Sequence, residues 1–190
     1  MTLETRSPWI VFAAGGVLET AFLPKRIFDL RVDRDVRTSV ALSAGALDFV
    51  TTVAMSAVSG SPVYDANTQL DARGVPMHLS LAEADLLVLV PATARIFAEC
   101  ALGIVSCTVT RLFAFTPKER IVLAPALHPR MDLRLYRDHE KKLVEVGCTV
   151  LARDDLFASW AEVERHVVAR LSLTRRPPTL GPVLLPDLAR

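Results

Sequence analysis

The chain has 190 residues, with 22 basic and 21 acidic side chains, so its formal net charge is only +1. This balance argues against a nucleic-acid-binding protein, which would normally carry a basic excess. Hydrophobic residues make up 51% of the chain and the mean hydropathy is +0.34, values that exclude a disordered chain and fit one folded domain. The high apolar content also predicts that part of the surface lies between subunits.

Cysteine usage and hydropathy point to a cytoplasmic protein. The three cysteines are too few for a disulfide framework and form no Cys-x-x-Cys pair of the kind found in zinc or redox motifs; they are Cys100, Cys107 and Cys148. The first eight residues include charged side chains and lack the apolar stretch of a signal peptide. The most apolar window, residues 86–105, contains Arg95, so we expect no membrane span. We also expect no metal site.

Apolar runs that predict strands alternate with segments of helical periodicity. The predicted strands are, in chain order, Trp9–Ala14, Val36–Leu42, Asp85–Val90, Arg120–Ala126 and Cys148–Leu151. The predicted helices are Val17–Leu30, Ala46–Val58, Leu79–Ala84, Thr93–Val105, Met131–Val146 and Leu156–Leu171. Pro24 should either kink the first helix or delay its start. Residues 63–77 predict a loop, and a domain of residues 1–173 is followed by a proline-rich tail, residues 174–190.

This alternation predicts an α/β fold of three layers, in which a parallel sheet carries helices on both faces. The continuous apolar run at residues 85–90 is typical of a parallel strand that is buried on both sides. Sheets of this kind bind ligands beyond the carboxyl ends of their strands. We therefore expect the site in the segments that follow the strands, which are residues 14–17, 43–47, 91–96 and 125–131.

The first two of these segments carry residues that suit an anion. Gly15 and Gly16 open a helix, where bare backbone and unpaired N–H groups favour a phosphate, although a tight turn without a ligand explains them equally well. Ser43 has a hydroxyl that suits either a helix N-cap or a phosphate. Neither the dinucleotide fingerprint Gly-x-Gly-x-x-Gly nor a Walker-type phosphate loop is present.

The later segments contribute to an ordered set of motifs. In chain order these are Pro76-x-His78, Ala84-Asp85, Pro91-Ala92-Thr93-Ala94, Gly103-Ile104, Thr110 and Pro125-Ala126-x-x-x-x-Met131. In order and spacing the set resembles the homo-oligomeric flavin-containing cysteine decarboxylases. That family includes the peptidyl-cysteine decarboxylases of lantibiotic and related ribosomal peptide pathways, and phosphopantothenoylcysteine decarboxylase. The resemblance covers about residues 10–151.

The resemblance implies a flavodoxin-like or Rossmann-like fold that binds FMN at a subunit interface of a homotrimer or homododecamer. The cofactor-binding residues that it implies are Gly15, Gly16, Ser43, Phe49, Thr93, Ala94, Arg95 and Thr110. Phe49 is expected to pack on the flavin from the second helix.

His78 matches the active-site histidine of the family. An imidazole titrates near pH 6.5, so it can take a proton from a thiol or hold a carboxylate near neutrality. A loop histidine without a role is the alternative. The implied reaction is the oxidative decarboxylation of the C-terminal cysteine of a ribosomally made precursor peptide. In it the thiol loses its proton, hydride passes to the flavin, a thioaldehyde forms and CO₂ leaves to give an aminoenethiol.

Several positions depart from the family pattern. His128 stands where the family has an asparagine that is expected to contact the substrate carboxylate. We expect His128 to act in catalysis and, with Met131, in substrate binding, unless the change abolishes activity. Arg95 replaces another asparagine, and its charge suits a flavin phosphate or a substrate carboxylate if it is not simply a surface residue. Ser106 and Cys107 replace an Asp-Asn pair.

Alternative functions therefore stay open. These are a flavin-binding homologue without decarboxylase activity, an enzyme like phosphopantothenoylcysteine decarboxylase, and a flavin prenyltransferase. Residues 152–157 lack the glycine-rich, cysteine-containing clamp of the second, which favours a peptide substrate. No basic cluster for an allylic phosphate is recognisable, which places the third last.

Overall fold

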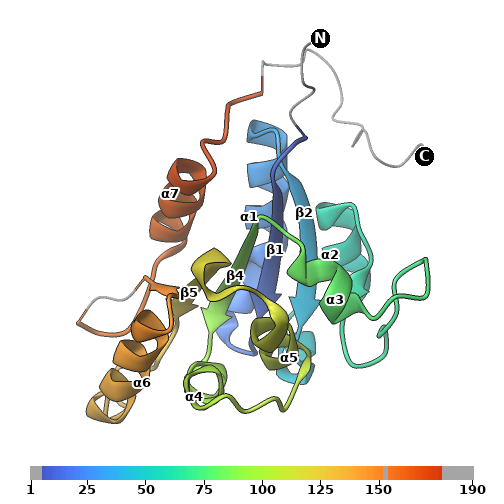
Figure 1. Cartoon of the computed structure of the whole chain (residues 1–190). Coiled ribbons are helices and arrows are strands. Elements are labelled where there is room, and N and C mark those ends of the chain that lie inside the picture. Colours follow the sequence, from blue (N-terminus) through green and yellow to red (C-terminus); the bar gives the residue numbers. More distant parts are fainter. Residues whose placement is uncertain (1–5, 152–153, 177–190) are drawn as a thin grey trace.

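A computed structural model describes residues 6–151 and 154–176, which fold around one parallel sheet (Figure 1). The strands are β1 (Trp9–Ala14), β2 (Arg37–Leu42), β3 (Val63–Tyr64), β4 (Leu86–Ala92), β5 (Ile121–Pro125) and β6 (Thr149–Val150). Their order in the sheet is β3-β2-β1-β4-β5-β6, the order of Rossmann-type doubly wound folds. The predicted α/β fold with a parallel sheet is confirmed.

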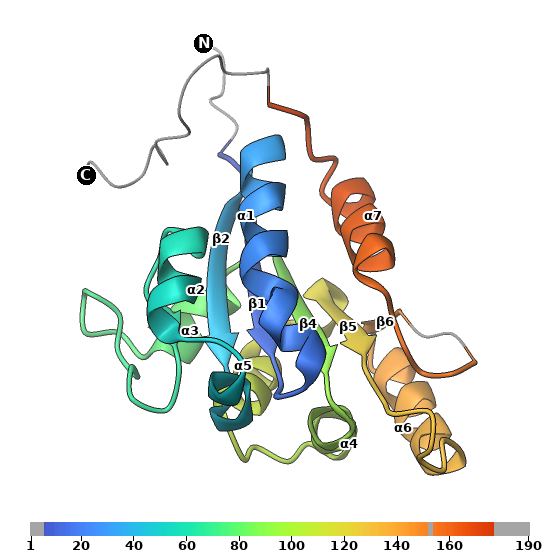
Figure 2. The same cartoon turned by 180° about the vertical axis from the view of Figure 1, so that it is seen from behind.

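Helices cover both faces of the sheet and complete the three layers (Figures 1 and 2). The α-helices are α1 (Leu23–Asp33), α2 (Thr52–Ser59), α3 (Met77–Ala82), α4 (Ala94–Leu102), α5 (Thr108–Phe115), α6 (Arg134–Glu145) and α7 (Trp160–Arg170). Short 3-10 turns are η1 (Leu18–Phe22), η2 (Ala44–Asp48) and η3 (Lys118–Arg120). One face carries α1, α2 and α7, and the other carries α3 to α6.

The central strands feed two separate cores because successive side chains of a strand point to opposite faces. Val11 and Ala13 of β1 belong to the core beneath α3 to α6. Ile10 and Phe12, their neighbours in the chain, belong to the core beneath α1, α2 and α7. Burial on both faces explains why β1 and β4 read as unbroken apolar runs in the sequence.

Pro24 meets one of its two predicted roles, whereas the strand that contains Pro91 is longer than predicted. Pro24 lies in the first turn of α1, where no backbone N–H is needed, so it delays the helix behind η1 and does not kink it. The predicted strand ended at Val90, but β4 continues through Pro91 to Ala92. Ala92 pairs with Pro125 after a shift of register, and its carbonyl accepts the N–H of Ala126 at 3.0 Å.

The sequence prediction missed two elements. β3 is a two-residue strand at the sheet edge, within the segment that was expected to be a loop. The helix expected to run to Val105 ends at Leu102, because Gly103 adopts a left-handed conformation with φ of +70°. A separate helix, α5, follows, and the hydroxyl of Thr108 at its start donates to the carbonyl of Leu42 at the end of β2 at 2.6 Å.

The first residues of the expected tail pack against the end of α1. The N–H of Arg176 donates to the carbonyl of Asp33 at 2.9 Å, and the N–H of Asp35 donates to the carbonyl of Thr174 at 3.4 Å. The remainder of that tail, from residue 177, lies outside the described residues. Among the helices of the described part, none combines the length and apolarity needed to cross a bilayer.

Candidate functional site

A cavity of about 480 Å³ lies where β1, β2, β4 and β5 end, and we call it the main cavity. It is lined by Gly16, Val17, Ser43, Ala44, Gly45, Thr93, Ala94, Arg95, Ile96, Ser106, Cys107, Ala126, His128 and Met131. The chain leaves β1 toward β2 on one side and reaches β4 on the other, so the cavity sits at the switch point of the sheet. Its volume lies within the roughly 300–1,000 Å³ usual for small-molecule sites.

The two positions after β1, Gly15 and Gly16, each exclude a side chain, but for different structural reasons. A Cβ atom on Gly16 would collide with the carbonyl of Gly45, so the loops after β1 and β2 meet backbone to backbone. A Cβ atom on Gly15 would lie 2.6 Å from the methyl group of Thr93. The N–H of Gly15 donates to the carbonyl of Pro91 at 3.0 Å, so the prediction that Gly15 offers a free N–H to an anion is wrong. Gly16, by contrast, lines the main cavity.

Ser43 occupies the N-cap position of η2, but its side chain makes no capping hydrogen bond. Its backbone N–H is held by the carbonyl of Ala14 at 3.0 Å, and the residue is only 9% exposed. Helix capping therefore does not account for the choice of serine at this position, and Ser43 lines the main cavity.

Thr93 and Arg95, at the start of α4, are already engaged with their own chain. Thr93 caps α4 by accepting the N–H of Ile96 at 3.4 Å. Arg95 Nε donates to Glu99 at 2.7 Å, and its Nη2 donates to the hydroxyl of Ser106 at 2.9 Å. Ser106 in turn donates to the second oxygen of Glu99 at 2.6 Å. Arg95 thus lines the cavity with its charge already balanced.

The carboxylate of Glu99 stays ionised within this cluster. Its burial would raise the pKa, but hydrogen bonds from Ser106 and Arg95 outweigh that effect and hold the pKa below its ordinary value. A second anion near Arg95 would therefore have to compete with a carboxylate of the same chain.

His128 stands exposed after β5, at the mouth of the main cavity. Its Nδ1 accepts the N–H of Arg130 at 3.1 Å, so the neutral ring carries its proton on Nε2 and can donate it. Together with Gly16, Val17 and Ala126, His128 also lines a neighbouring cavity of about 730 Å³, which we call the outer cavity. Met131 lines the main cavity beside it.

Phe49 and Thr110 lie outside the lining of the main cavity. Phe49 follows η2, ahead of α2, and lines the outer cavity with 39% of its surface exposed, so the expectation that it extends from the second helix is wrong. Thr110 is 1% exposed, and its hydroxyl accepts the N–H groups of Ser106 and Cys107 at 3.0 and 3.1 Å. It shapes the turn into α5, and Cys107 is the residue there that reaches the cavity.

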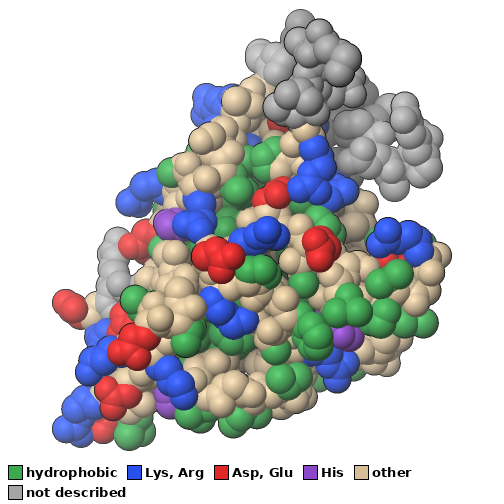
Figure 3. Space-filling model, in the orientation of Figure 1, with side chains coloured by type: hydrophobic (Ala, Val, Ile, Leu, Met, Phe, Trp, Pro, Cys, Tyr) green, Lys and Arg blue, Asp and Glu red, His purple; other side chains and the backbone are tan. Residues whose placement is uncertain are grey.

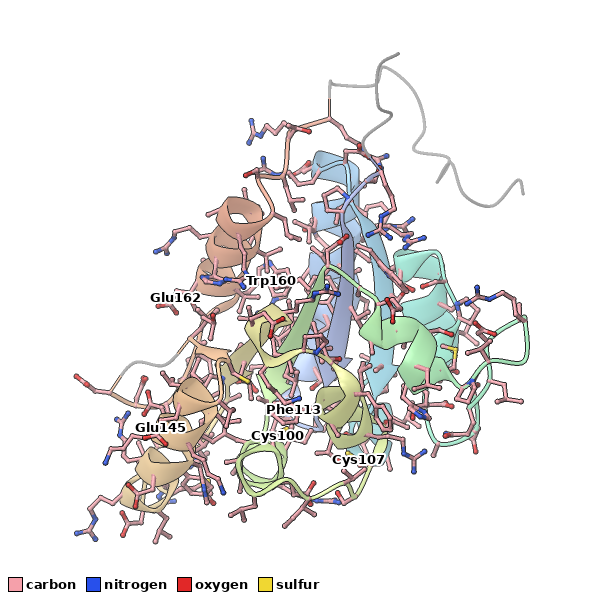
Figure 4. All side chains as sticks on the ribbon, in the orientation of Figure 1. Cys100, Cys107, Phe113, Glu145, Trp160 and Glu162 are labelled. Carbon is pink, nitrogen blue, oxygen red and sulfur yellow. The ribbon has the colours of Figure 1, made fainter. Side chains whose placement is uncertain are left out.

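His78 lies in the first turn of α3, and its ring centroid is 4.7 Å from that of Phe115, the last residue of α5. Cys107, beside the main cavity, precedes the other end of α5 (Figure 4). Eight residues of helix separate these ends, about 12 Å at roughly 1.5 Å per residue. Within one chain, His78 therefore does not line the main or the outer cavity.

The surroundings of His78 keep its imidazole neutral. Burial lowers its pKa, and the positive charge of Arg111 lowers it further. Arg111 is fixed by donating to the side-chain carbonyl of Gln69 at 3.1 Å. Apolar side chains gather on the surface over α3 and α5 (Figure 3), where Leu79 and Phe115 are 42% and 52% exposed.

The structure adds residues that sequence reasoning did not single out. Val17 and Gly45 line the main cavity, and Arg111 lies near His78. Gly45 carried a signal, because a glycine three residues after the end of a strand suits a close backbone approach. Arg111 carried none, because its helix was not predicted.

The Flavoprotein family matches residues 2–172. Among curated relatives, the coenzyme A biosynthesis bifunctional protein CoaBC of Escherichia coli strain K12 is 33% identical over 129 residues, which is 67% of this chain and 30% of the relative. The CoaBC protein of Thermococcus kodakarensis is 34% identical over 116 residues, 56% of this chain and 27% of the relative. The chain thus spans about 30% of the length of the first of these relatives.

Solved structures share the fold. A mutant PPC decarboxylase superimposes with a TM-score of 0.76 at 16% identity, covering 87% of this chain and 99% of that one. The FMN-dependent cysteine decarboxylase TvaF from thioviridamide biosynthesis gives a TM-score of 0.71 at 25% identity, covering 87% and 98%. The peptidyl-cysteine decarboxylase EpiD gives 0.68 at 15% identity, covering 86% and 99%. The resemblance noted in the sequence is confirmed, and this chain belongs to the Flavoprotein family.

Proposed function

We propose that the protein catalyses the FMN-dependent oxidative decarboxylation of the C-terminal cysteine of a ribosomally made precursor peptide, giving an aminoenethiol. The observation that carries this proposal is the main cavity, which brings together Gly16, Ser43, Thr93, Ala94 and His128 from four separate loops. The likeness to TvaF, an FMN-dependent cysteine decarboxylase, supports a cysteine substrate.

The residues of the main cavity fit a flavin mononucleotide. Gly16 allows a close backbone approach, and the hydroxyl of Ser43 lacks a capping partner, so this side suits the phosphate and ribityl chain. Val17, Ile96 and Cys107 add apolar lining that suits the ring system. A bound flavin would supply the two-electron acceptor that the oxidation requires.

The two histidines have distinct roles in the proposal. His78 is neutral near pH 7 and takes the proton of the substrate thiol. His128 uses its Nε2–H to hold and orient the substrate carboxylate until CO₂ leaves. Overall, the substrate loses CO₂ and two hydrogens, the electrons pass to the cofactor, and a further oxidant must restore it.

A second copy of the chain completes this site. His78 lies at the far end of α5 from the main cavity, and the exposed Leu79 and Phe115 beside it offer apolar surface for contact. Docking of this face on the main cavity of a neighbouring chain would bring the base to the substrate. This arrangement suits the homotrimer or homododecamer implied by the resemblance.

Phosphopantothenoylcysteine is the second candidate substrate, favoured by the curated relatives, which are CoaBC proteins of coenzyme A biosynthesis. It presents the same reacting cysteine, with a carboxylate for His128 and a thiol for His78. The two candidates differ only in what is attached to the cysteine nitrogen.

Parallel incubation of the FMN-loaded protein with both candidates separates them. We expect precursor peptides ending in cysteine to lose CO₂ and two hydrogens by mass spectrometry, and the matched peptides ending in serine to remain unchanged. Conversion of phosphopantothenoylcysteine alone would replace the peptide with the second candidate. A protein that takes up no FMN would contradict both.

A further inference from the structure

A small cavity of about 130 Å³, which we call the side cavity, opens at the same edge of the sheet, between α1 and α7. It is lined by Glu19, Arg26, Val90, Pro91, Ala124, Ala126, Phe157, Ala158, Ser159 and Trp160. Glu19, Ala126 and Phe157 also line the outer cavity, which shares Gly16 and His128 with the main cavity. The outer cavity therefore adjoins both of the others, and Ala126 lines all three.

Arg26 is held in the side cavity by aromatic rings and not by acceptors. Its Cζ lies 5.5 Å from the ring centroid of Phe22 and 5.6 Å from that of Trp160, which stands at the start of α7 (Figure 4). None of the hydrogen bonds or ion pairs found among residues 6–151 and 154–176 uses its guanidinium. Its burial lowers the pKa, yet it keeps its charge, so its N–H groups are partly desolvated donors.

Glu19 presents the complementary acceptor to the same space. Its charge acts on Arg26 and raises the pKa of the guanidinium, but the two side chains form no ion pair in the described part of the chain. The nearby start of α7 does not use either group, because Ser159 and Glu162 cap that helix reciprocally. The side cavity thus has a donor and an acceptor that face it without joining.

The chemistry of this pair selects its ligand. A carboxylate or phosphate would bind Arg26 but meet repulsion from Glu19, and a cation would meet the reverse. A secondary amide has both a carbonyl acceptor and an N–H donor and carries no charge. A cavity of about 130 Å³ has room for one such group and its neighbouring carbons.

We propose that Arg26 and Glu19 form a subsite for one backbone amide of the substrate peptide, upstream of the reacting cysteine. Arg26 donates to the amide carbonyl, and Glu19 accepts the amide N–H. The outer cavity holds the intervening residues. This inference rests on the proposed function for the class of its ligand, and it adds the requirement that the substrate be an extended chain.

Equilibrium binding tests the subsite without turnover. Unreactive peptides that end in serine are titrated into the FMN-loaded protein by calorimetry, with the chain lengthened one residue at a time. We expect affinity to rise in one step when the chain reaches the side cavity. Arg26→Gln and Glu19→Ala should each remove the step, weakening the longer peptides about tenfold, since hydrogen bonds to charged groups are the strong ones.

Lys25→Gln is the matched control. Lys25 is the exposed neighbour of Arg26 on α1, and its ammonium pairs with Asp29 at 2.5 Å, away from the side cavity. This variant should bind all peptides as the unaltered protein does. Thermal unfolding of the three variants shows whether each one folds.

Replacing peptide amides by esters, one position at a time, tests the unaltered protein. One position alone should weaken binding, and Glu19→Ala should erase that penalty, because an ester lacks the N–H. Equal binding by Arg26→Gln, Glu19→Ala and the unaltered protein would overturn the subsite, even if cysteine peptides are decarboxylated. Length-dependent binding through these residues without decarboxylation would instead contradict the proposed function and leave the subsite standing.

Discussion

The two ends of α5 differ in how completely one chain builds them. At the amino-terminal end, four strand ends and the loops behind them close around the main cavity within a single chain. At the carboxyl-terminal end, His78 and Phe115 lie on an open, apolar surface that belongs to neither the main nor the outer cavity. The difference teaches that one chain builds the main cavity, which we propose as the cofactor cradle, whereas His78, the proposed base, would join such a site only through a second copy.

The largest loss of flavin binding is expected from a substitution of Gly16, where two loops of the main cavity meet backbone to backbone. Gly16→Ala should abolish flavin retention and lower the free energy of unfolding by about 1–3 kcal/mol, because the new Cβ collides with the Gly45 carbonyl. Gly45→Ala is the matched control, since its Cβ would lie 3.7 Å from the Cα of Gly16, an ordinary contact. Visible absorbance and thermal unfolding report both. Equal flavin content in the two variants would contradict the claim that flavin binding requires the close approach of Gly16 to Gly45.

At the other end of α5, a substitution of His78 should lower turnover without affecting flavin binding. His78→Ala should lower kcat about 10²–10⁴-fold, the usual range for a general base, and leave flavin content unchanged. Co-expression of His78→Ala with Gly16→Ala should recover part of the activity, because mixed oligomers contain sites with an intact cavity and an intact base. Full turnover by His78→Ala, or no recovery in mixed oligomers, would show that the two ends do not act together.

The pH profile sharpens the same comparison. The pKa of His78 is lowered by burial and by Arg111, and a base must be neutral to act, so kcat/KM should be level around pH 7 and fall only at acid pH, below the ordinary histidine range near 6.5. Arg111→Gln removes one of the two causes, so the midpoint should move up toward the ordinary value. A midpoint that moves down would contradict this environment for His78.

Within the main cavity, a substitution of His128 should weaken substrate binding more than flavin binding. His128→Ala removes the Nε2–H donor and should raise KM about tenfold with flavin content unchanged, since the lost hydrogen bond is to a charged group. His128→Asn retains a donor and should restore KM. An unaltered KM in both variants would remove His128 from substrate binding.

The smallest effect is expected at Arg95. Its guanidinium is bonded to Glu99 and Ser106, and exposed ion pairs contribute only about 0–1 kcal/mol. Arg95→Gln should therefore change flavin affinity by less than about fivefold, as measured by fluorescence titration. A loss as large as that of Gly16→Ala would mean that Arg95 leaves Glu99 to bind the cofactor.

The contrast between the two regions also shows which parts of the fold and of the candidate site could be predicted from the sequence. The bounds of β1 were predicted, and the rule of strand ends located Gly16, Ser43, Thr93 and His128, because apolar runs and strand polarity are local properties. The helix α5 was not predicted because it is short and carries β-branched residues in its first turn. The position of His78 against α5, and the hydrogen bond that occupies the Gly15 N–H, follow from packing between distant segments, which periodicity does not encode.

Anaerobic single turnover tests the central claim most directly. The FMN-loaded protein is mixed with a peptide ending in cysteine while flavin absorbance and released CO₂ are followed together. We expect the flavin to bleach with the release of one CO₂ per flavin and to recover its colour only when oxygen is admitted. CO₂ release without bleaching, or no change in either signal with any cysteine-terminated substrate, would contradict the account.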